Sequence, residues 1–219
     1  AHIWFSKGTP TRLGLILDLS PRNLERILYF AQYIIVSIDE DARRDAVSAM
    51  DQYRQTELSR LGEECEAIIN ESNIEVFLES VEDEETEAVA KNISKDNPNS
   101  DSMSPEDNVR AIFDFRKQNL ETESIDRVNE LENIQKMDML TEARYRELRD
   151  RFGDVFKADM GAEAILDILK NLDLDEVREE LQIQVRDTSG QRRKKAIKRL
   201  RVIESFRSSG NKTEWMILT

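Results

Sequence analysis

Apolar side chains recur every three or four residues along most of the chain, a pattern that predicts a mainly α-helical fold with a few short β-strands. In residues 191–210 this spacing would place one helix face on a core, and the apolar positions are Ala196, Ile197, Leu200, Ile203 and Phe206. The first three turns of the same stretch are crowded with cations: Arg192, Arg193, Lys194, Lys195, Lys198, Arg199 and Arg201. Cations at a helix N-terminus oppose the helix dipole, so one interpretation is that they bind anions outside the helix. The alternative is a solvated face beside acidic neighbours.

The first forty residues contain one strong helix signal and two strand signals. Ser20 suits an N-cap and Pro21 the first helical position, so together with the apolar period they predict a helix over 22–31. Residues 33–38 are rich in β-branched side chains and are predicted to form a strand. A short strand is also expected at 3–5, followed by a loop of turn residues and two cations over 6–12.

The pattern changes over residues 39–138. Apolar residues keep a broken three-and-four spacing over 47–68 and again over 109–134, which predicts two long helices. Ser104 suits the N-cap of the second helix, and Pro105 suits its first helical position. Between the helices, residues 82–105 offer little to bury and are predicted to be mobile. We therefore expect an antiparallel, coiled-coil-like helical hairpin with few contacts to the rest of the chain.

Three further helices are predicted before the basic one. Thr141 caps a helix through residue 151, a second covers 161–172, and Asp173 caps a third over 174–187. This third helix is acidic and should lie antiparallel to the basic helix at 191–210, so it could neutralise part of the basic face. The final stretch, 214–219, is expected to be an apolar strand.

Charge divides the chain more sharply than its total of −13 suggests. Residues 39–138 carry 28 acidic and 11 basic residues, a net charge of −17, whereas the two flanks carry 17 acidic and 21 basic residues, a net charge of +4. The two flanks are thus mildly basic and are separated by an acidic middle. The pI of about 4.7 describes the whole chain, so it does not argue against nucleic-acid binding by the flanks. We interpret the acidic pairs of the middle as solvating rather than catalytic or metal-binding.

Several classes of protein are disfavoured by composition. The single cysteine, Cys65, excludes an internal disulfide and a cysteine metal site, and the single histidine, His2, excludes a His-based triad or a multi-His metal site. No glycine-rich phosphate loop, or nucleophile with a base, supports an independent enzyme. The apolar run at 13–19 is too short to cross a membrane, and a reducing cytoplasm is expected. Because the chain begins at Ala1 and stops inside an apolar stretch, it is expected to be an excised piece.

The two flanks resemble a known family. Residues 1–35 read AHIWFSKGTPTRLGLILDLSPRNLERILYFAQYII, and the second half contains LTEARYRELRDRFGDVFKADMGAEAILDIL and GQRRKKAIKRLRVIESFRSSGNKTEWMILT. These stretches, about 1–38 and 139–219, resemble successive parts of the clamp region of the bacterial DNA-directed RNA polymerase β′ subunit. Residues 39–138 do not match the general family pattern and are interpreted as a lineage-specific insertion.

The resemblance implies a bacterial cytoplasmic role, at the nucleoid, as a structural part of a nucleotidyltransferase. Magnesium and zinc are implied for the full subunit, with ligands outside this chain, so no cofactor, metal site or catalytic residue is expected here and the fragment alone should be inactive. Implied partners are the other polymerase subunits, sigma factor through neighbouring regions, and downstream DNA. The DNA-contacting candidates are Lys7, Arg12 and Arg22, and the candidate anion-binding residues are Arg192, Arg193, Lys194 and Lys195.

Two alternatives remain open for these residues and for the middle of the chain. Arg12 and Arg22 could instead bond to carboxylates such as Asp18 and Glu25, and Trp4, Phe30, Phe206 and Trp215 are interpreted as core residues rather than stacking platforms. The chain could also be an acidic helical protein-interaction module, whose segment 39–138 docks on a polymerase subunit, a transcription factor or another protein.

Overall fold

The computed structural model describes residues 5, 10–71, 73–81 and 104–217. Within these residues the fold is mainly helical, with one small antiparallel sheet, which confirms the predicted fold class. The chain divides into two compact units, Ala1–Glu40 with Ile134–Thr219 (unit 1) and Asp41–Asn133 (unit 2). His2, Trp4, Lys7, most of the expected strand at 3–5 and nearly all of the segment predicted to be mobile lie outside the described residues.

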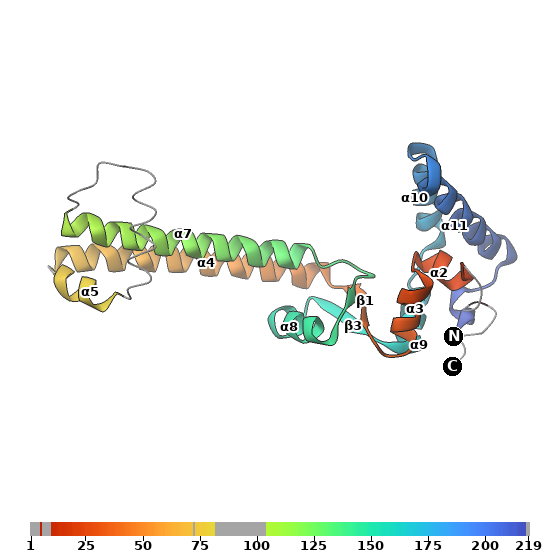
Figure 1. The fold of residues 1–219 in the computed structure, drawn as a ribbon, viewed down its shortest axis with the longest axis horizontal. Helices are drawn as coiled ribbons and strands as arrows, with labels where there is room; N and C mark the ends of the chain where they lie inside the picture. Colours follow the sequence, from red (N-terminus) through yellow and green to blue (C-terminus); the bar gives the residue numbers. More distant parts are fainter. Residues whose placement is uncertain (1–4, 6–9, 72, 82–103, 218–219) are drawn as a thin grey trace. The chain divides into compact units, whose positions relative to one another are not determined.

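Unit 1 combines both ends of the chain, coloured red and blue in Figure 1. Its described elements, in chain order, are α2 (Arg12–Leu17), α3 (Pro21–Leu28), β1 (Tyr33–Ile38), β2 (Met139–Leu140), α8 (Glu142–Phe152), β3 (Phe156–Asp159), α9 (Gly161–Lys170), α10 (Leu174–Asp187), α11 (Gly190–Ser209) and the 3-10 helix η1 (Thr213–Met216). The predicted helices at 141–151, 161–172, 174–187 and 191–210 all form, with shifts of at most two residues at their ends.

One apolar core joins the two ends of the chain within unit 1. Leu13 and Ile16 of α2, Ile165 of α9 and Ile203 of α11 are each at most 1% exposed and belong to the same cluster. Because α2 lies about 150 or more positions before Ile165 and Ile203, the first forty residues cannot bury their apolar face without the last eighty. The face predicted for α9 is buried as expected, as shown by Ala164, Ile165, Ile168 and Leu169.

The sheet of unit 1 has the strand order β2-β1-β3, and both pairings are antiparallel. Strand β1 has the bounds predicted from its β-branched residues. A bulge between Ile35 and Ser37 shifts its register against β3. The two edge strands were not predicted individually, because β2 has two residues and β3 four, too few for a period-two pattern to show.

Helix α3 forms where the N-cap signals place it but ends three residues earlier than predicted. Ser20 Oγ accepts a hydrogen bond from the Asn23 amide (3.2 Å). At the other end, the amides of Phe30 and Ala31 donate to the carbonyls of Ile27 and Arg26, the paired pattern of a Schellman motif. Phe30 occupies the left-handed position at φ 59° that glycine usually takes, so no residue in the sequence marked this helix end.

Residues 213–216 form a 3-10 helix where a strand over 214–219 was predicted, and residues 218–219 lie outside the described residues. The amides of Trp215 and Ile217 donate to the carbonyls of Lys212 and Glu214, which closes the turns of η1. The buried Thr213 hydroxyl donates to the Leu169 carbonyl at the end of α9 (2.9 Å). This tertiary hydrogen bond fixes the turn against α9, so it overrides the local preference of an apolar run for extended structure.

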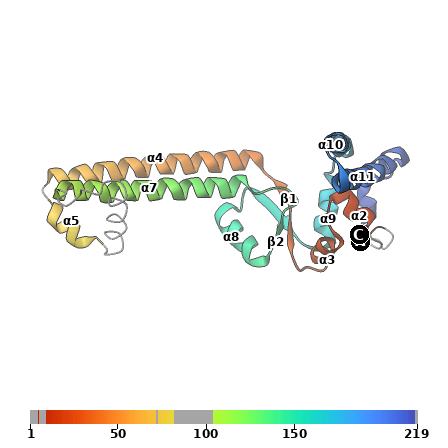
Figure 2. The same ribbon diagram turned by 45° about the horizontal axis from the view of Figure 1, so that its top comes forward.

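Unit 2 contains α4 (Glu40–Asn70, which begins one residue before the unit), α5 (Ile74–Ser80) and α7 (Pro105–Glu132). The two predicted long helices form and lie side by side in both views (Figures 1 and 2). Gly62 of α4 lies beside Lys117 of α7, and their small core contains Leu61, Cys65, Val109 and Phe113. Ser104 caps α7 as predicted, its Oγ accepting from the Asp107 amide (3.1 Å).

Candidate nucleic-acid interface

The basic helix α11 packs beside the acidic helix α10, in the antiparallel arrangement expected from the short turn between them (Figures 1 and 2). Arg207, near the end of α11, forms an ion pair with Asp175, near the start of α10. Among the described residues, no other ion pair joins these two helices. The sequence suggested that the acidic helix could neutralise part of the basic face. It does not do so by direct pairing with the cations at the start of α11.

Helix α2 and the residue that follows it supply the polar partners of the cationic part of α11 among the described residues. Thr11 caps this six-residue helix, and its buried Oγ1 accepts from the Gly14 amide (2.9 Å). The helix ends at Asp18, which has a left-handed φ of 58°, and the Leu19 amide donates to the Gly14 carbonyl (2.9 Å). A Cβ on Gly14 would lie 2.7 Å from both the Leu19 carbonyl oxygen and Thr11 Oγ1, so this close turn requires glycine.

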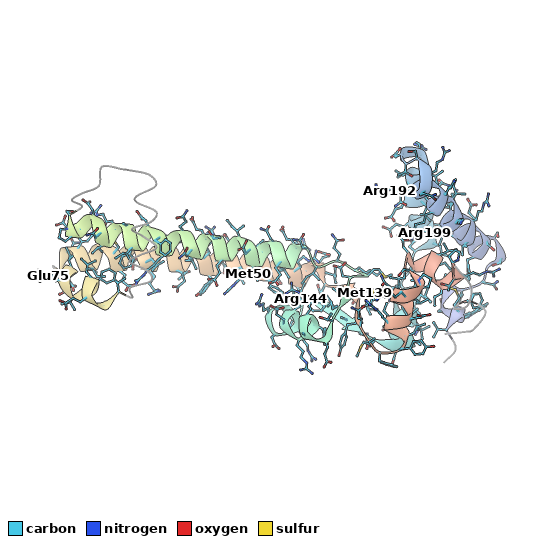
Figure 3. The ribbon with its side chains drawn as sticks, viewed as in Figure 1. Met50, Glu75, Met139, Arg144, Arg192 and Arg199 are labelled. Atoms are coloured by element: carbon cyan, nitrogen blue, oxygen red, sulfur yellow. The ribbon has the colours of Figure 1, made fainter. Side chains whose placement is uncertain are left out.

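Arg199 connects α11 to the C-terminal end of α2. Its side chain is only 12% exposed. Nε donates to the Leu15 carbonyl (2.9 Å), Nη2 lies 3.5 Å from the Ile16 carbonyl and Nη1 lies 3.3 Å from Asp18 Oδ2. Burial lowers the pKa of the Arg199 guanidinium, while the carboxylates of Asp18 and Glu180 act in the opposite direction. Arg199 is thus occupied by contacts within the protein, and Figure 3 shows it where α11 passes α2.

Asp18 also binds a second cation of α11. Lys195 Nζ lies 2.6 Å from Asp18 Oδ1, so one carboxylate holds two of the seven clustered cations. The remaining five, which are Arg192, Arg193, Lys194, Lys198 and Arg201, are exposed and form no ion pair with any described residue. These five can therefore be offered to an external anion without breaking an internal contact.

The candidates near the N-terminus have different surroundings from those considered on sequence grounds. Arg12 and Arg22 are exposed, and neither pairs with a carboxylate that the structure describes. Asp18, the expected alternative partner of Arg12, is held by Lys195 and Arg199 instead. Lys7 is not among the described residues.

Two of the aromatic residues interpreted as core lie at the surface instead. Phe206 is buried and contacts Phe5, with ring centroids 6.4 Å apart. Phe30 is 68% exposed and Trp215 60% exposed. Phe30 follows the end of α3, and its ring lies over Gly161 with its other side exposed, while Trp215 lies on the outer side of η1. Trp4 lies outside the described residues.

Two hollows adjoin α2 and α11. One, of about 330 Å³, is lined by Gln191, Lys194, Lys195 and Lys198 together with Asp18 and the turn that leads into α3. The other, of about 300 Å³, is lined by Arg12, Ser205, Ser209, Lys212, Trp215 and four other residues. We call them the Lys194 hollow and the Arg12 hollow. Both present cations at a concave surface, which suits a phosphate group.

Other kinds of site have little support in the part of the chain that the structure describes. No group of three or more His, Cys, Asp or Glu side chains there is arranged to hold a metal ion. Likewise, none of its helices is long and apolar enough to span a bilayer.

Comparison with known proteins gives consistent relatives. No family model matches the chain. The β′ subunit of DNA-directed RNA polymerase from Dehalococcoides mccartyi is 37% identical over 218 residues, which cover 100% of this chain and 15% of the relative. The corresponding subunit of Chloroflexus aggregans is 33% identical over 306 positions, covering all of this chain and 20% of the relative, and that of Nocardia farcinica is 34% identical over 222 positions, covering 99% of this chain and 16% of the relative.

These alignments include the acidic middle as well as the flanks. The 218 aligned positions of the Dehalococcoides mccartyi subunit nearly equal the 219 residues of this chain, so that relative has a segment of similar length in place of the middle. The chain spans 15 to 20% of the length of the relatives it matches. Over its whole length, the chain is homologous to one segment of the β′ subunit of bacterial DNA-directed RNA polymerase.

Proposed function

We propose that the chain is a segment of the clamp of a bacterial RNA polymerase β′ subunit, and that unit 1 helps to hold DNA during RNA synthesis. The observation that carries this proposal lies at the exposed cationic start of α11, where five of the seven clustered cations pair with no described carboxylate although acidic α10 lies beside them. Contacts from Arg and Lys to phosphates position DNA without reading its sequence. Catalysis, magnesium and zinc would belong to other parts of the subunit.

The residues assigned to DNA in this proposal are Arg12 and Arg22 at the starts of α2 and α3, and Arg192, Arg193 and Lys194 at the start of α11. Lys7 stays a prediction of the same kind. Lys195 contributes less in this proposal, because Asp18 already holds its ammonium group (2.6 Å).

A salt titration of DNA binding tests the proposal. Fluorescence anisotropy of a labelled duplex of about 20 base pairs would be measured with the full chain and with the Arg192→Ala/Arg193→Ala variant. Each lost phosphate contact should lower the slope of log affinity against log salt by about one, so the variant should lose about two. The matched control is Arg60→Ala/Arg127→Ala in unit 2, which removes the same charge from exposed side chains paired with Glu57, Glu64 and Glu123. Equal losses in both variants would refute a DNA site on α11.

A second function is favoured by the separate core of unit 2. We infer that this acidic hairpin is an accessory surface for a protein, because its charge of −17 over residues 39–138 should repel DNA. Purified polymerase subunits and sigma factor would be tested for binding to the full chain and to a variant lacking residues 41–133. Partner binding lost with the hairpin would support this function, whereas DNA binding lost with the hairpin would contradict the assignment of DNA to unit 1.

A further inference from the structure

The Lys194 hollow and the Arg12 hollow both adjoin the same short helix. Gly14, Leu15 and Asp18 line the first hollow, whereas Arg12, the first residue of α2, lines the second. On α11, Lys194 and Lys198 line the first hollow, and Ser205 and Ser209 line the second. Helix α2 therefore runs antiparallel along α11, and the hydrogen bond from Arg199 to the Leu15 carbonyl fixes it between the two hollows.

Both hollows adjoin the same face of α11. Lys194, Lys198, Ser205 and Ser209 follow one another at spacings of four, seven and four, and such positions share one side of an α-helix. The centres of the two pairs are eleven residues apart, which corresponds to about 16 Å along the helix axis at 1.5 Å per residue. One strand of duplex DNA carries a phosphate about every 3.4 Å along its axis, so about five phosphates of one strand would span this distance.

The lining residues give each hollow an excess of positive charge. The Lys194 hollow contains three lysines and one carboxylate, and that carboxylate is already held by Lys195 and Arg199. The Arg12 hollow contains Arg12 and Lys212, and the Lys212 ammonium lies 3.7 Å from the carboxylate of Glu214. The exposed ring of Trp215 adds an apolar wall of the kind that packs against sugar or base.

We propose that the two hollows are successive phosphate sites for one nucleic-acid backbone, which lies along α11 and crosses α2. This inference rests on the proposed DNA-holding function and specifies its track. Phosphates occupy the Lys194 hollow through Lys194 and Lys198, and the Arg12 hollow through Arg12 and Lys212. Arg199 is a positioning residue in this arrangement, because it sets the distance between the hollows while its own guanidinium stays inside the protein.

The test uses the full 219-residue chain and duplexes of about 8 and 20 base pairs, with anisotropy measured across a salt series. The hollow variants are Lys194→Gln/Lys198→Gln and Arg12→Gln/Lys212→Gln, since glutamine removes the charge but keeps most of the side-chain stem. Lys136→Gln/Lys170→Gln is the matched control, because it removes two exposed cations of unit 1 that line neither hollow. Tryptophan fluorescence and circular dichroism establish that each variant is folded; if one is not, the single changes Lys198→Gln and Arg12→Gln replace it.

Each hollow variant should lower the slope of log affinity against log salt by about two on both duplexes, and the variant with all four substitutions should lower it by about four. When the slope is lowered by two, the loss of affinity caused by a fourfold rise in salt is about 16-fold smaller than in the unchanged chain. The track is overturned if either hollow variant binds DNA with the same affinity and salt slope as the control. It is also overturned if the variant with all four substitutions binds no more weakly than the weaker of the two double variants, because a backbone would then occupy one hollow at a time. If Arg192→Ala/Arg193→Ala weakens binding while the hollow variants do not, DNA binding by unit 1 stands and only the track fails. If no unit 1 variant differs from its control, the DNA-holding function fails as well.

Discussion

Replacing Arg199 should destabilise unit 1 more than replacing any of the exposed cations around it. The side chain is 12% exposed, and its guanidinium contacts the end of α2 at three points. Arg199→Ala would leave the Leu15 carbonyl and Asp18 without these donors. A hydrogen bond that involves a charged group contributes about 1.5–3 kcal/mol, and the longer contacts add little. We therefore expect the free energy of unfolding of unit 1 to fall by about 2–3 kcal/mol.

Two comparison variants separate this effect from a general loss of charge. Lys195→Ala removes an equal charge from the same carboxylate, but the ion pair is more than 40% exposed on both sides and should be worth less than about 1 kcal/mol. Arg199→Lys keeps the charge but cannot reproduce the fork of donors that reaches both a carbonyl and Asp18, so it should recover only part of the loss.

Urea unfolding followed by tryptophan fluorescence measures the effect in the relevant unit. The only tryptophans, Trp4 and Trp215, both belong to unit 1, so the signal does not depend on the hairpin. Circular dichroism at about 222 nm would follow both units together, and differing transitions would show that they unfold separately. If Arg199→Ala costs no more than Lys195→Ala, then Arg199 does not fix α2 to α11, and its role as a positioning residue is wrong.

Three further predictions test other parts of the structure. Gly161→Ala should destabilise unit 1 by at least about 1 kcal/mol in urea unfolding, because φ is +79° and the new Cβ would lie 2.6 Å from the Phe30 ring; adding Phe30→Ala should relieve the clash but not the backbone strain. Cys65 should react with a thiol reagent more slowly than a free cysteine at about pH 8 and reach the free rate only when the hairpin is unfolded, since burial raises the pKa of its thiol and keeps it protonated. Thr213→Val should lower the unfolding midpoint of unit 1, with a cost of about 1–2 kcal/mol, because the Leu169 carbonyl loses the buried Thr213 hydroxyl and keeps the longer hydrogen bond from the Leu172 amide (3.4 Å); no change would mean that the Thr213 hydrogen bond does not hold η1.

Local signals predicted the helices well because capping chemistry is local. Ser20, Ser104, Thr141 and Asp173 each accept a hydrogen bond from an amide two or three residues on, so the side chain that marks the helix start also forms the contact. The end of α3 could not be predicted in the same way. A phenylalanine at φ 59° is held by the packing of its ring over Gly161, which lies 131 positions away in the sequence.

The candidate site was predictable in its charge but not in its division of roles. The run of cations was evident, and the helical spacing places Arg199 on the face of Ala196 and Ile203, whereas Arg201 is exposed. The groups that the Arg199 guanidinium contacts could not be predicted, because Asp18 and the carbonyls of Leu15 and Ile16 lie more than 180 positions away. Acidic α10, adjacent in sequence, was the natural candidate to neutralise the cluster, but among the described residues its ion pair with α11 involves only the far end of that helix.

This dependence on distant contacts constrains how the chain can vary among relatives. The candidate track needs α2 and α11 in contact, and the sheet needs β1 between β2 and β3, so a long segment inserted within any of these elements would separate parts of one core. Strands β1 and β2 are antiparallel neighbours, with Tyr33 opposite Leu140, and a connection between two such strands can be lengthened at little cost to either. The alignment with the Chloroflexus aggregans subunit extends over 306 positions, well beyond the 219 residues of this chain. We therefore expect the additional residues of that relative to lie between the positions that correspond to 41 and 133, as a longer hairpin. An excess found instead within α2 or α11 would contradict the proposed role of α2 as the element that crosses between the two hollows.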